Sequence, residues 1–172
     1  MNLIHEIDPG NKEKATVIIE IPRHSRNKYE IDKKTGLIAL DRALHTAQDY
    51  PVDYGFIPQT LWYDDDPLDC VVLTTFPLSP GIVVRARFVG LLKMIDDGDS
   101  DDKVIAVPTH DPRWDKVKDI DDINSHTLKE VAHFFETYKG LQNVKVEIKG
   151  YEGAEEAKKA FEEAREMYEK SK

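Results

Sequence analysis

Alternation of apolar and polar positions is the main structural signal along this chain. Five segments combine such alternation, or a short apolar run, with β-branched residues, which is typical of strands. They are residues 15–21, 70–76, 82–94, 104–108 and 143–149. Residues 26–40 predict a further β-hairpin, because the turn sequence Lys33-Lys34-Thr35-Gly36 separates two extended segments.

Helical spacing of apolar residues occurs late in the chain. Residues 125–139 and 153–170 each place apolar side chains on one helical face. Thr127 and Glu130 fit a capping box near the start of the first helix. Residues 46–60 contain two prolines and a glycine, so they predict an ordered loop.

The overall composition predicts one globular domain. Its 172 residues suffice for a sizeable core, and strands followed by helices, without a repeat or a composition break, predict a single domain over residues 1–172. Acidic residues outnumber basic residues by 33 to 24, which argues against a nucleic-acid partner. Because neither a signal-peptide pattern nor a membrane-length apolar run is present, we expect a soluble, cytoplasmic protein without a membrane partner.

The candidate chemistry centres on DDDPLDC, residues 64–70. Pro67 disfavours a helix and favours an extended Asp66, so the side chains of Asp64 and Asp66 share a face. Asp69 opens the next strand, so three carboxylates can converge there. Like charges at 4 Å repel by roughly 1 kcal/mol in water, and clustered carboxylate oxygens suit hard cations such as Mg²⁺. A solvated acidic turn is the alternative, which the flanking aromatic residues and apolar strand disfavour.

A second acidic segment, DDGDSDD at residues 96–102, also follows an apolar strand. If the two strands are neighbours, both segments face one cleft, where Glu20 and Glu30 can contribute further carboxylates. The second segment is not an EF-hand, because Asp102 and Pro108 occupy the positions of its required glycine and glutamate. Scattered histidines and a single cysteine argue against a zinc site, and the known phosphate-loop and dinucleotide motifs are absent from the sequence.

Basic and phenolic residues accompany the acidic segments near the ends of predicted elements. They are Lys28, Arg42, Lys103 and Lys139, together with Tyr50, Tyr54 and Tyr138. Each alone would be interpreted as a surface charge or a core aromatic residue. Together with carboxylate-bound cations, such donors form a receptor suited to phosphate groups.

These segments resemble the soluble inorganic pyrophosphatases of family I, in their shorter prokaryotic form. DDDPLDC fits the family signature D-[SGDN]-D-[PE]-[LIVMF]-D-[LIVMGAC] at every position. The segments IEIPRHSRNKYEID, LDRAL, YPVDYGFIPQT and HFFETYKGL match as well, as does the acidic loop after GLLKM, so the resemblance spans nearly the whole chain. It implies a mainly β fold with α-helices (α+β), in which a five-stranded OB-type closed barrel packs against two helices.

The resemblance also implies residue roles. The implied metal ligands are Asp64, Asp69, Asp96, Asp101, Glu20 and Glu30. Asp101 is preferred over Asp102 because the family has one residue between this aspartate and the lysine that follows. Asp66 is the implied general base. The implied phosphate-binding and catalytic side chains are Lys28, Arg42, Tyr54, Lys103, Tyr138 and Lys139, with Tyr50 in support.

The implied reaction is hydrolysis of inorganic pyrophosphate to two orthophosphates. Several Mg²⁺ ions per site, with Mn²⁺ or Zn²⁺ as possible substitutes, would hold a bridging water and lower its pKa toward about 7. That water attacks in line while Asp66 accepts a proton, without a covalent intermediate. The resemblance also implies a homohexamer, for which residues 125–139, with Phe134 off the main apolar stripe, offer an interface.

Two other functions are alternatives to pyrophosphate hydrolysis. A barrel that binds nucleic acid or cations without chemistry would show exposed aromatic residues among Lys and Arg and few acids, and this sequence shows the reverse. A metal-dependent phosphatase acting on organic phosphoesters or nucleotides would use the same residue types, and the sequence alone does not determine the size of the pocket.

Overall fold

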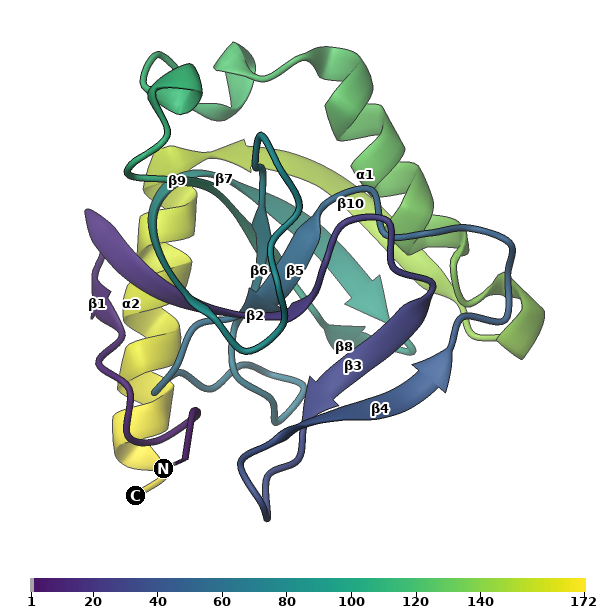
Figure 1. The fold of residues 1–172 in the computed structure, drawn as a ribbon, viewed down its shortest axis with the longest axis horizontal. Helices are drawn as coiled ribbons and strands as arrows, with labels where there is room; N and C mark the ends of the chain where they lie inside the picture. Colours follow the sequence, from purple (N-terminus) through teal and green to yellow (C-terminus); the bar gives the residue numbers. More distant parts are fainter. Residues whose placement is uncertain (1) are drawn as a thin grey trace.

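The computed structural model describes residues 2–172, and five of its strands close into a ring (Figure 1). Neighbours follow the order β2, β5, β6, β9 and β7, and β7 pairs again with β2. The strands are β2 Lys14–Ile21, β5 Asp53–Phe56, β6 Asp69–Val72, β7 Val83–Asp96 and β9 Lys103–Pro108. Within the ring only β6 and β9 run parallel. The ring confirms the expected mainly β fold of OB type.

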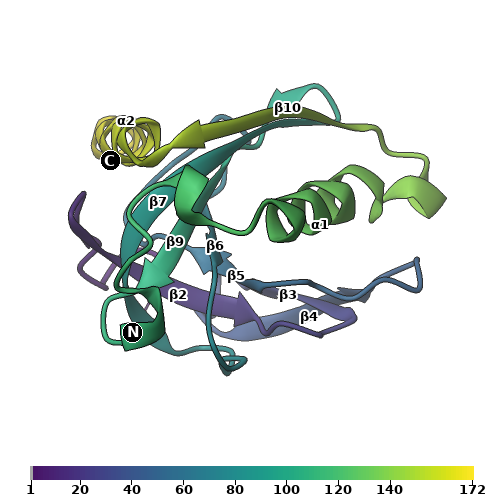
Figure 2. The same ribbon diagram turned by 90° about the horizontal axis from the view of Figure 1, so that it is seen from above.

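The remaining elements surround this ring. The shorter or peripheral strands are β1 Gly10–Asn11, β3 Asn27–Ile31, β4 Ile38–Ala43, β8 Asp99–Ser100 and β10 Val146–Gly153. β3 and β4 form a separate two-stranded sheet, which confirms the predicted hairpin. The helices are α1 Ser125–Thr137 and α2 Ala154–Lys170, with 3₁₀ turns at Pro112–Trp114, Ile120–Asp122 and Gly140–Gln142. Figure 2 shows α1 and the β3–β4 hairpin on the same side of the molecule, away from α2.

The expectation of a loop over residues 46–60 is wrong for its central part. Asp53–Phe56 form β5, a fully buried strand between β2 and β6. Proline and glycine in this stretch suggested a loop, but Gly55 allows β5 to pack closely against β2. Its Cα faces the β2 backbone at Ile18 so closely that a Cβ would overlap the Ile18 carbonyl oxygen. The glycine therefore permits the close approach of two strands instead of breaking one.

The start of α1 also differs from expectation. The N-cap is Asn124, whose Oδ1 accepts hydrogen bonds from the backbone N–H groups of His126 (2.9 Å) and Thr127 (3.4 Å). Thr127 lies inside the helix, so the capping box predicted from Thr127 and Glu130 is not formed there. Asparagine is as good an N-cap as threonine or better, which explains why the earlier start is preferred.

The core uses both faces of the central strands. Alternate residues of β6 and β9 enter two different apolar clusters, so these strands have no polar face. One cluster includes α2 through Phe161, and the other includes α1 through Phe134 and Phe135. Phe134 is buried and its ring centroid lies 4.7 Å from that of Tyr50. The proposed interface role of Phe134 is therefore wrong, because the residue is already covered within one chain.

Across residues 2–172, none of the helices has the length and apolar character needed to cross a membrane.

Gly55→Ala tests the close approach of β5 and β2. We expect it to lower the free energy of unfolding by roughly 1–3 kcal/mol or more, since the added methyl group must displace backbone. Denaturant unfolding measures the change. Gly140→Ala is the matched control, because a Cβ at Gly140 meets nothing within 4 Å. Equal stability of the two variants would contradict the packing described here.

Candidate active site

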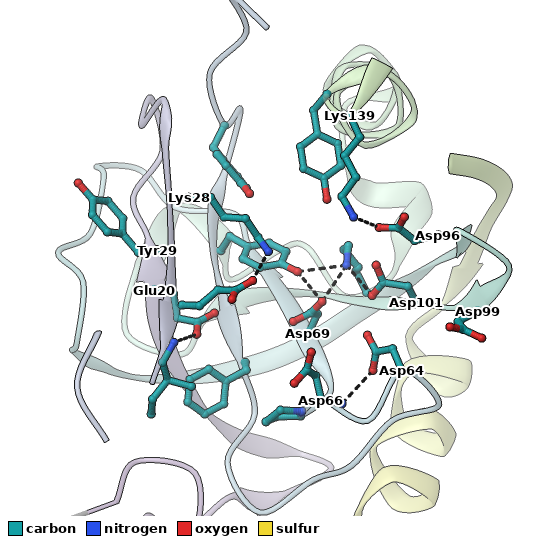
Figure 3. A pocket seen from close by; sticks show the side chains of 18 of the residues that line it. Glu20, Lys28, Tyr29, Asp64, Asp66, Asp69, Asp96, Asp99, Asp101 and Lys139 are labelled. Atoms are coloured by element: carbon teal, nitrogen blue, oxygen red, sulfur yellow. Dashed lines mark hydrogen bonds and ion pairs between the residues drawn. The ribbon is translucent and has the colours of Figure 1, made fainter. Parts of the chain in front are cut away.

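A pocket of about 320 Å³ opens where the ring, the β3–β4 hairpin and the end of α1 meet (Figure 3). Its lining includes almost every residue that the sequence singled out. Those residues are Glu20, Lys28, Glu30, Tyr50, Tyr54, Asp64, Asp66, Asp69, Asp96, Asp101, Lys103, Tyr138 and Lys139. Arg42 is not in the lining; it pairs with Asp41 at 2.5 Å, beside Lys28 on the adjacent strand.

Three carboxylates converge at the centre of the pocket. Asp64, Asp69 and Asp101 each offer an oxygen within 4.8 Å of the others. Asp69 opens β6, and its register partner in the parallel strand is Lys103, the first residue of β9. The turns that lead into β6 and β9 therefore bring their acidic residues to the same place. The two acidic segments do face one cleft, as the sequence predicted if their strands were close.

Lys103 lies among these acids. Its side chain is 2% exposed, and its Nζ lies 2.8 Å from both Asp69 Oδ2 and Asp101 Oδ1. The same ammonium donates to the Tyr54 hydroxyl at 3.1 Å, and that hydroxyl in turn contacts Asp69. Burial lowers the pKa of Lys103, but the charges of Asp101 and Asp69 outweigh it and hold the pKa well above its ordinary value. Lys103 is thus a fixed positive charge.

One lysine does not neutralise the whole group of acids. Burial, followed by the charge of Asp69, raises the pKa of Glu20 to about 8 and that of Asp64 to about 6. Burial also raises the pKa of Asp101 to about 7, although Lys103 opposes the shift. An all-oxygen donor set whose members resist ionisation together is suited to a hard divalent cation.

Asp96, in the acidic segment 96–102, also indicates a cation site. Its Oδ2 pairs with Lys139, while its buried Oδ1 has no hydrogen-bond partner among the described residues. A buried carboxylate oxygen is rarely left unpaired, and a cation would satisfy it. Glu20 is partly satisfied already, because its Oε1 accepts the Ile31 N–H at 2.8 Å.

The adjacent residues Asp101 and Asp102 occupy different environments. Asp101 belongs to the central cluster. Asp102 points away from it, pairs with Lys93 and accepts the Met94 N–H at 3.1 Å. Adjacent side chains of an extended segment point in opposite directions, so Asp101 faces the cluster and Asp102 does not.

Cationic and phenolic groups form the rest of the wall. Lys28 pairs with Glu30 on β3, and Lys139 follows α1, next to Tyr138. Tyr50 and Tyr54 also line the pocket and form an aromatic cluster with Phe134 and Phe135. Burial raises the pKa of both Tyr50 and Tyr54 well above the ordinary value, so both remain protonated donors.

Several lining residues were not selected from the sequence. They are Tyr29, Ile31, Lys33, Phe56, Pro67, Asp97 and Asp99. Asp97 and Asp99 lie in the acidic segment 96–102, so that run was the available signal for them. Lys33 carried no signal, because it lies in an ordinary polar turn and reaches the pocket only through tertiary structure.

A ring of this type, with an oxygen-rich acidic centre and a wall of lysines and tyrosines, defines a site for cations together with a small anion. The sequence profile described as "Inorganic pyrophosphatase" matches residues 17–169. The chain therefore belongs to the inorganic pyrophosphatase family.

Individual proteins show the same relationship. The inorganic pyrophosphatase of Geobacillus stearothermophilus is 49% identical over 154 residues, which cover 90% of this chain and 93% of that protein. The one from Haloferax volcanii is 48% identical over 167 residues, which cover 96% and 94%. The crystal structure of inorganic pyrophosphatase from Thermus thermophilus superposes with a TM-score of 0.94 at 45% identity, covering 98% of this chain and 99% of that one.

The raised pKa values predict opposite pH effects with and without divalent cations. Between about pH 4.5 and 8 the folded protein holds more protons on these acids than the unfolded chain does, so stability falls as pH rises through that window. Each group can contribute a slope of at most about 1.4 kcal/mol per pH unit. In EDTA, we expect the midpoint temperature of thermal unfolding to be lower at pH 8 than at pH 5. Mg²⁺ should raise this midpoint temperature more at pH 8 than at pH 5.

Glu20→Gln is the variant that isolates one of these groups. The amide keeps an oxygen to accept the Ile31 N–H but does not titrate. We expect a shallower pH dependence in EDTA than in the parent protein. An unchanged slope would show that Glu20 is already ionised in the folded state.

Proposed function

We propose that this protein hydrolyses inorganic pyrophosphate to two orthophosphates in a reaction that requires Mg²⁺. The observation that carries the proposal is the convergence of Asp64, Asp69 and Asp101 beside a wall of lysines and tyrosines. Membership of the inorganic pyrophosphatase family over residues 17–169 supports it. The relatives from Geobacillus and Haloferax carry the same description.

The size of the pocket favours a small substrate. Its volume of about 320 Å³ is at the lower end of the range for small-molecule sites, and cations must share it with the substrate. The cationic groups of the wall come from two separate elements, Lys28 from β3 and Lys139 from the residues after α1. Charged donors from two elements suit a substrate with two phosphate groups, whereas a phosphomonoester presents only one.

Asp64, Asp69 and Asp101 would hold the first divalent cations, and Asp96, Glu20 and Glu30 would contribute to further ones. Bound Mg²⁺ supplies Lewis-acid stabilisation of phosphate charge and acidifies water. Mn²⁺ and Zn²⁺ are possible substitutes, because both accept carboxylate oxygen ligands.

The phosphate groups would be bound by the basic and phenolic side chains. Lys28, Lys103 and Lys139 each pair with a carboxylate of the site, and an ammonium group retains further N–H donors for a phosphate oxygen. Tyr54 and Tyr138 are protonated, since burial raises both pKa values, and can donate as well. Arg42 lies next to Lys28 and would need to turn from Asp41 to take part.

Asp66 is the proposed general base. It lies on the same turn as Asp64 and lines the pocket, but it is outside the central cluster of Asp64, Asp69 and Asp101. Its side chain is 56% exposed. A base in this position can accept a proton from the attacking water and release it to solvent without disturbing the cation ligands. No residue of the chain needs to form a bond to phosphorus.

Asp66→Asn tests the assignment. We expect Mg²⁺-dependent release of phosphate from pyrophosphate by the parent protein, and a loss of roughly 10²–10⁴-fold in kcat in the variant, the usual contribution of a general base. Asp65→Asn is the matched control, because Asp65 is the neighbouring acid and asparagine tolerates its left-handed conformation (φ 64°).

Each alternative outcome has a separate meaning. No phosphate release by the parent protein with Mg²⁺, Mn²⁺ or Zn²⁺ would overturn the proposed function. Full activity of Asp66→Asn would retain the function and move the base elsewhere. Faster release from nucleotides than from pyrophosphate would favour the wider phosphatase function.

We also infer a homohexamer from the family resemblance. Leu37, Leu40, Phe76 and Leu141 are large apolar side chains that one chain leaves exposed, and neighbouring copies would cover such residues. Light scattering is expected to give about six times the 19.7 kDa mass of the chain. A mass equal to one chain at micromolar concentration would contradict this inference.

A further inference from the structure

Hydrogen bonds hold the backbone of Asp66 firmly, but these bonds do not fix its carboxylate. The Asp66 carbonyl accepts the Trp62 N–H at 2.7 Å, and the Asp66 N–H donates to Asp64 Oδ1 at 3.2 Å. Pro67 restricts the next backbone angle. These contacts place Cα and leave the side-chain rotation free. Figure 3 shows the Asp66 side chain at the edge of the acidic group, near Asp64 and Asp69.

Lys33 is the residue that reaches this carboxylate. It belongs to the turn between β3 and β4, and its Nζ lies 2.5 Å from Asp66 Oδ1. The same ammonium donates to the Asp65 carbonyl oxygen at 3.3 Å. Lys33 therefore grips both the side chain of Asp66 and the backbone just before it. Among residues 2–172, it is the one ion-pair partner that Asp66 has.

The turn that carries Lys33 is itself well ordered by hydrogen bonds. Asp32 Oδ1 accepts the N–H groups of Lys34 (2.8 Å) and Thr35 (2.9 Å). The Asp32 N–H donates to the Leu37 carbonyl at 2.8 Å, which closes the turn. Lys33 thus extends from a fixed base, and its contact joins the β3–β4 hairpin to the acidic turn.

We propose that Lys33 is a positioning residue for Asp66, an inference that rests on the proposed function. By binding Oδ1, Lys33 limits side-chain rotation and leaves Oδ2, which has no hydrogen bond to any described residue, as the oxygen that accepts the proton.

If Lys33 has this role, its loss should change the reaction rate much more than the folding stability. Exposed ion pairs contribute little to folding, and both partners here are more than half exposed. Misplacement of a catalytic group, in contrast, slows a reaction by up to about 10²-fold. Loss of Lys33 should therefore reduce turnover without a matching loss of folded protein, and without a matching loss of substrate affinity.

The test compares Lys33→Met with Lys34→Met in the intact protein, by phosphate release from pyrophosphate at saturating Mg²⁺. Lys34 is an exposed neighbour on the same turn and forms no ion pair with the residues described, so the two variants change charge equally. We expect kcat to fall on the order of tenfold in Lys33→Met, with KM within about twofold. Lys34→Met should match the parent protein, and Lys33→Arg should restore most of kcat.

A double-mutant cycle with Asp66→Asn shows whether Lys33 acts through Asp66. If it does, adding Lys33→Met to Asp66→Asn should cause no further loss, because the positioned group is already absent. A further loss of the same size, a higher KM with unchanged kcat, or equal effects of Lys33→Met and Lys34→Met would each overturn the inference. An active parent protein with an unaffected Lys33→Met would reject this role alone, whereas an inactive parent protein would reject the proposed function.

Discussion

Repulsion among clustered carboxylates is the constraint on which this structure depends. Asp64, Asp69 and Asp101 lie close enough to bind one cation together. A single buried ammonium, that of Lys103, contacts two of them. A buried ion pair contributes little net stability once desolvation is counted, but removing one partner leaves an uncompensated charge. Lys103 therefore serves mainly to make an acidic centre possible inside a folded chain.

The parallel pairing of β6 and β9 is what brings these charges together. Asp69 and Lys103 each begin a strand and are register partners, so the turns that precede them end at the same edge of the ring. The aromatic cluster of Tyr50, Tyr54, Phe134 and Phe135 closes one side. Such a wall excludes water, which strengthens the attraction between the site and an anionic substrate or a cation.

Local sequence was sufficient for some parts of the site and not for others. Pro67 and the spacing of Asp64 and Asp66 describe a turn whose geometry is short-range, so that part was predictable. Lys33 lies 32 residues from its backbone contact at Asp65, and nothing in its own turn indicates that partner. Phe134 shows the opposite error, because its place off the apolar stripe suggested an exposed residue, whereas Tyr50 covers it.

The sequence alone determined most strands and both helices, the hairpin at residues 26–40, the acidic turns and the family resemblance, because periodicity and short motifs are local properties. Only the tertiary structure decided that Asp53–Phe56 is a central strand, that Asp101 faces the cluster while Asp102 turns away, and that Arg42 lies outside the pocket lining. These outcomes depend on strand register and on close approach of backbones, which join residues far apart in the chain.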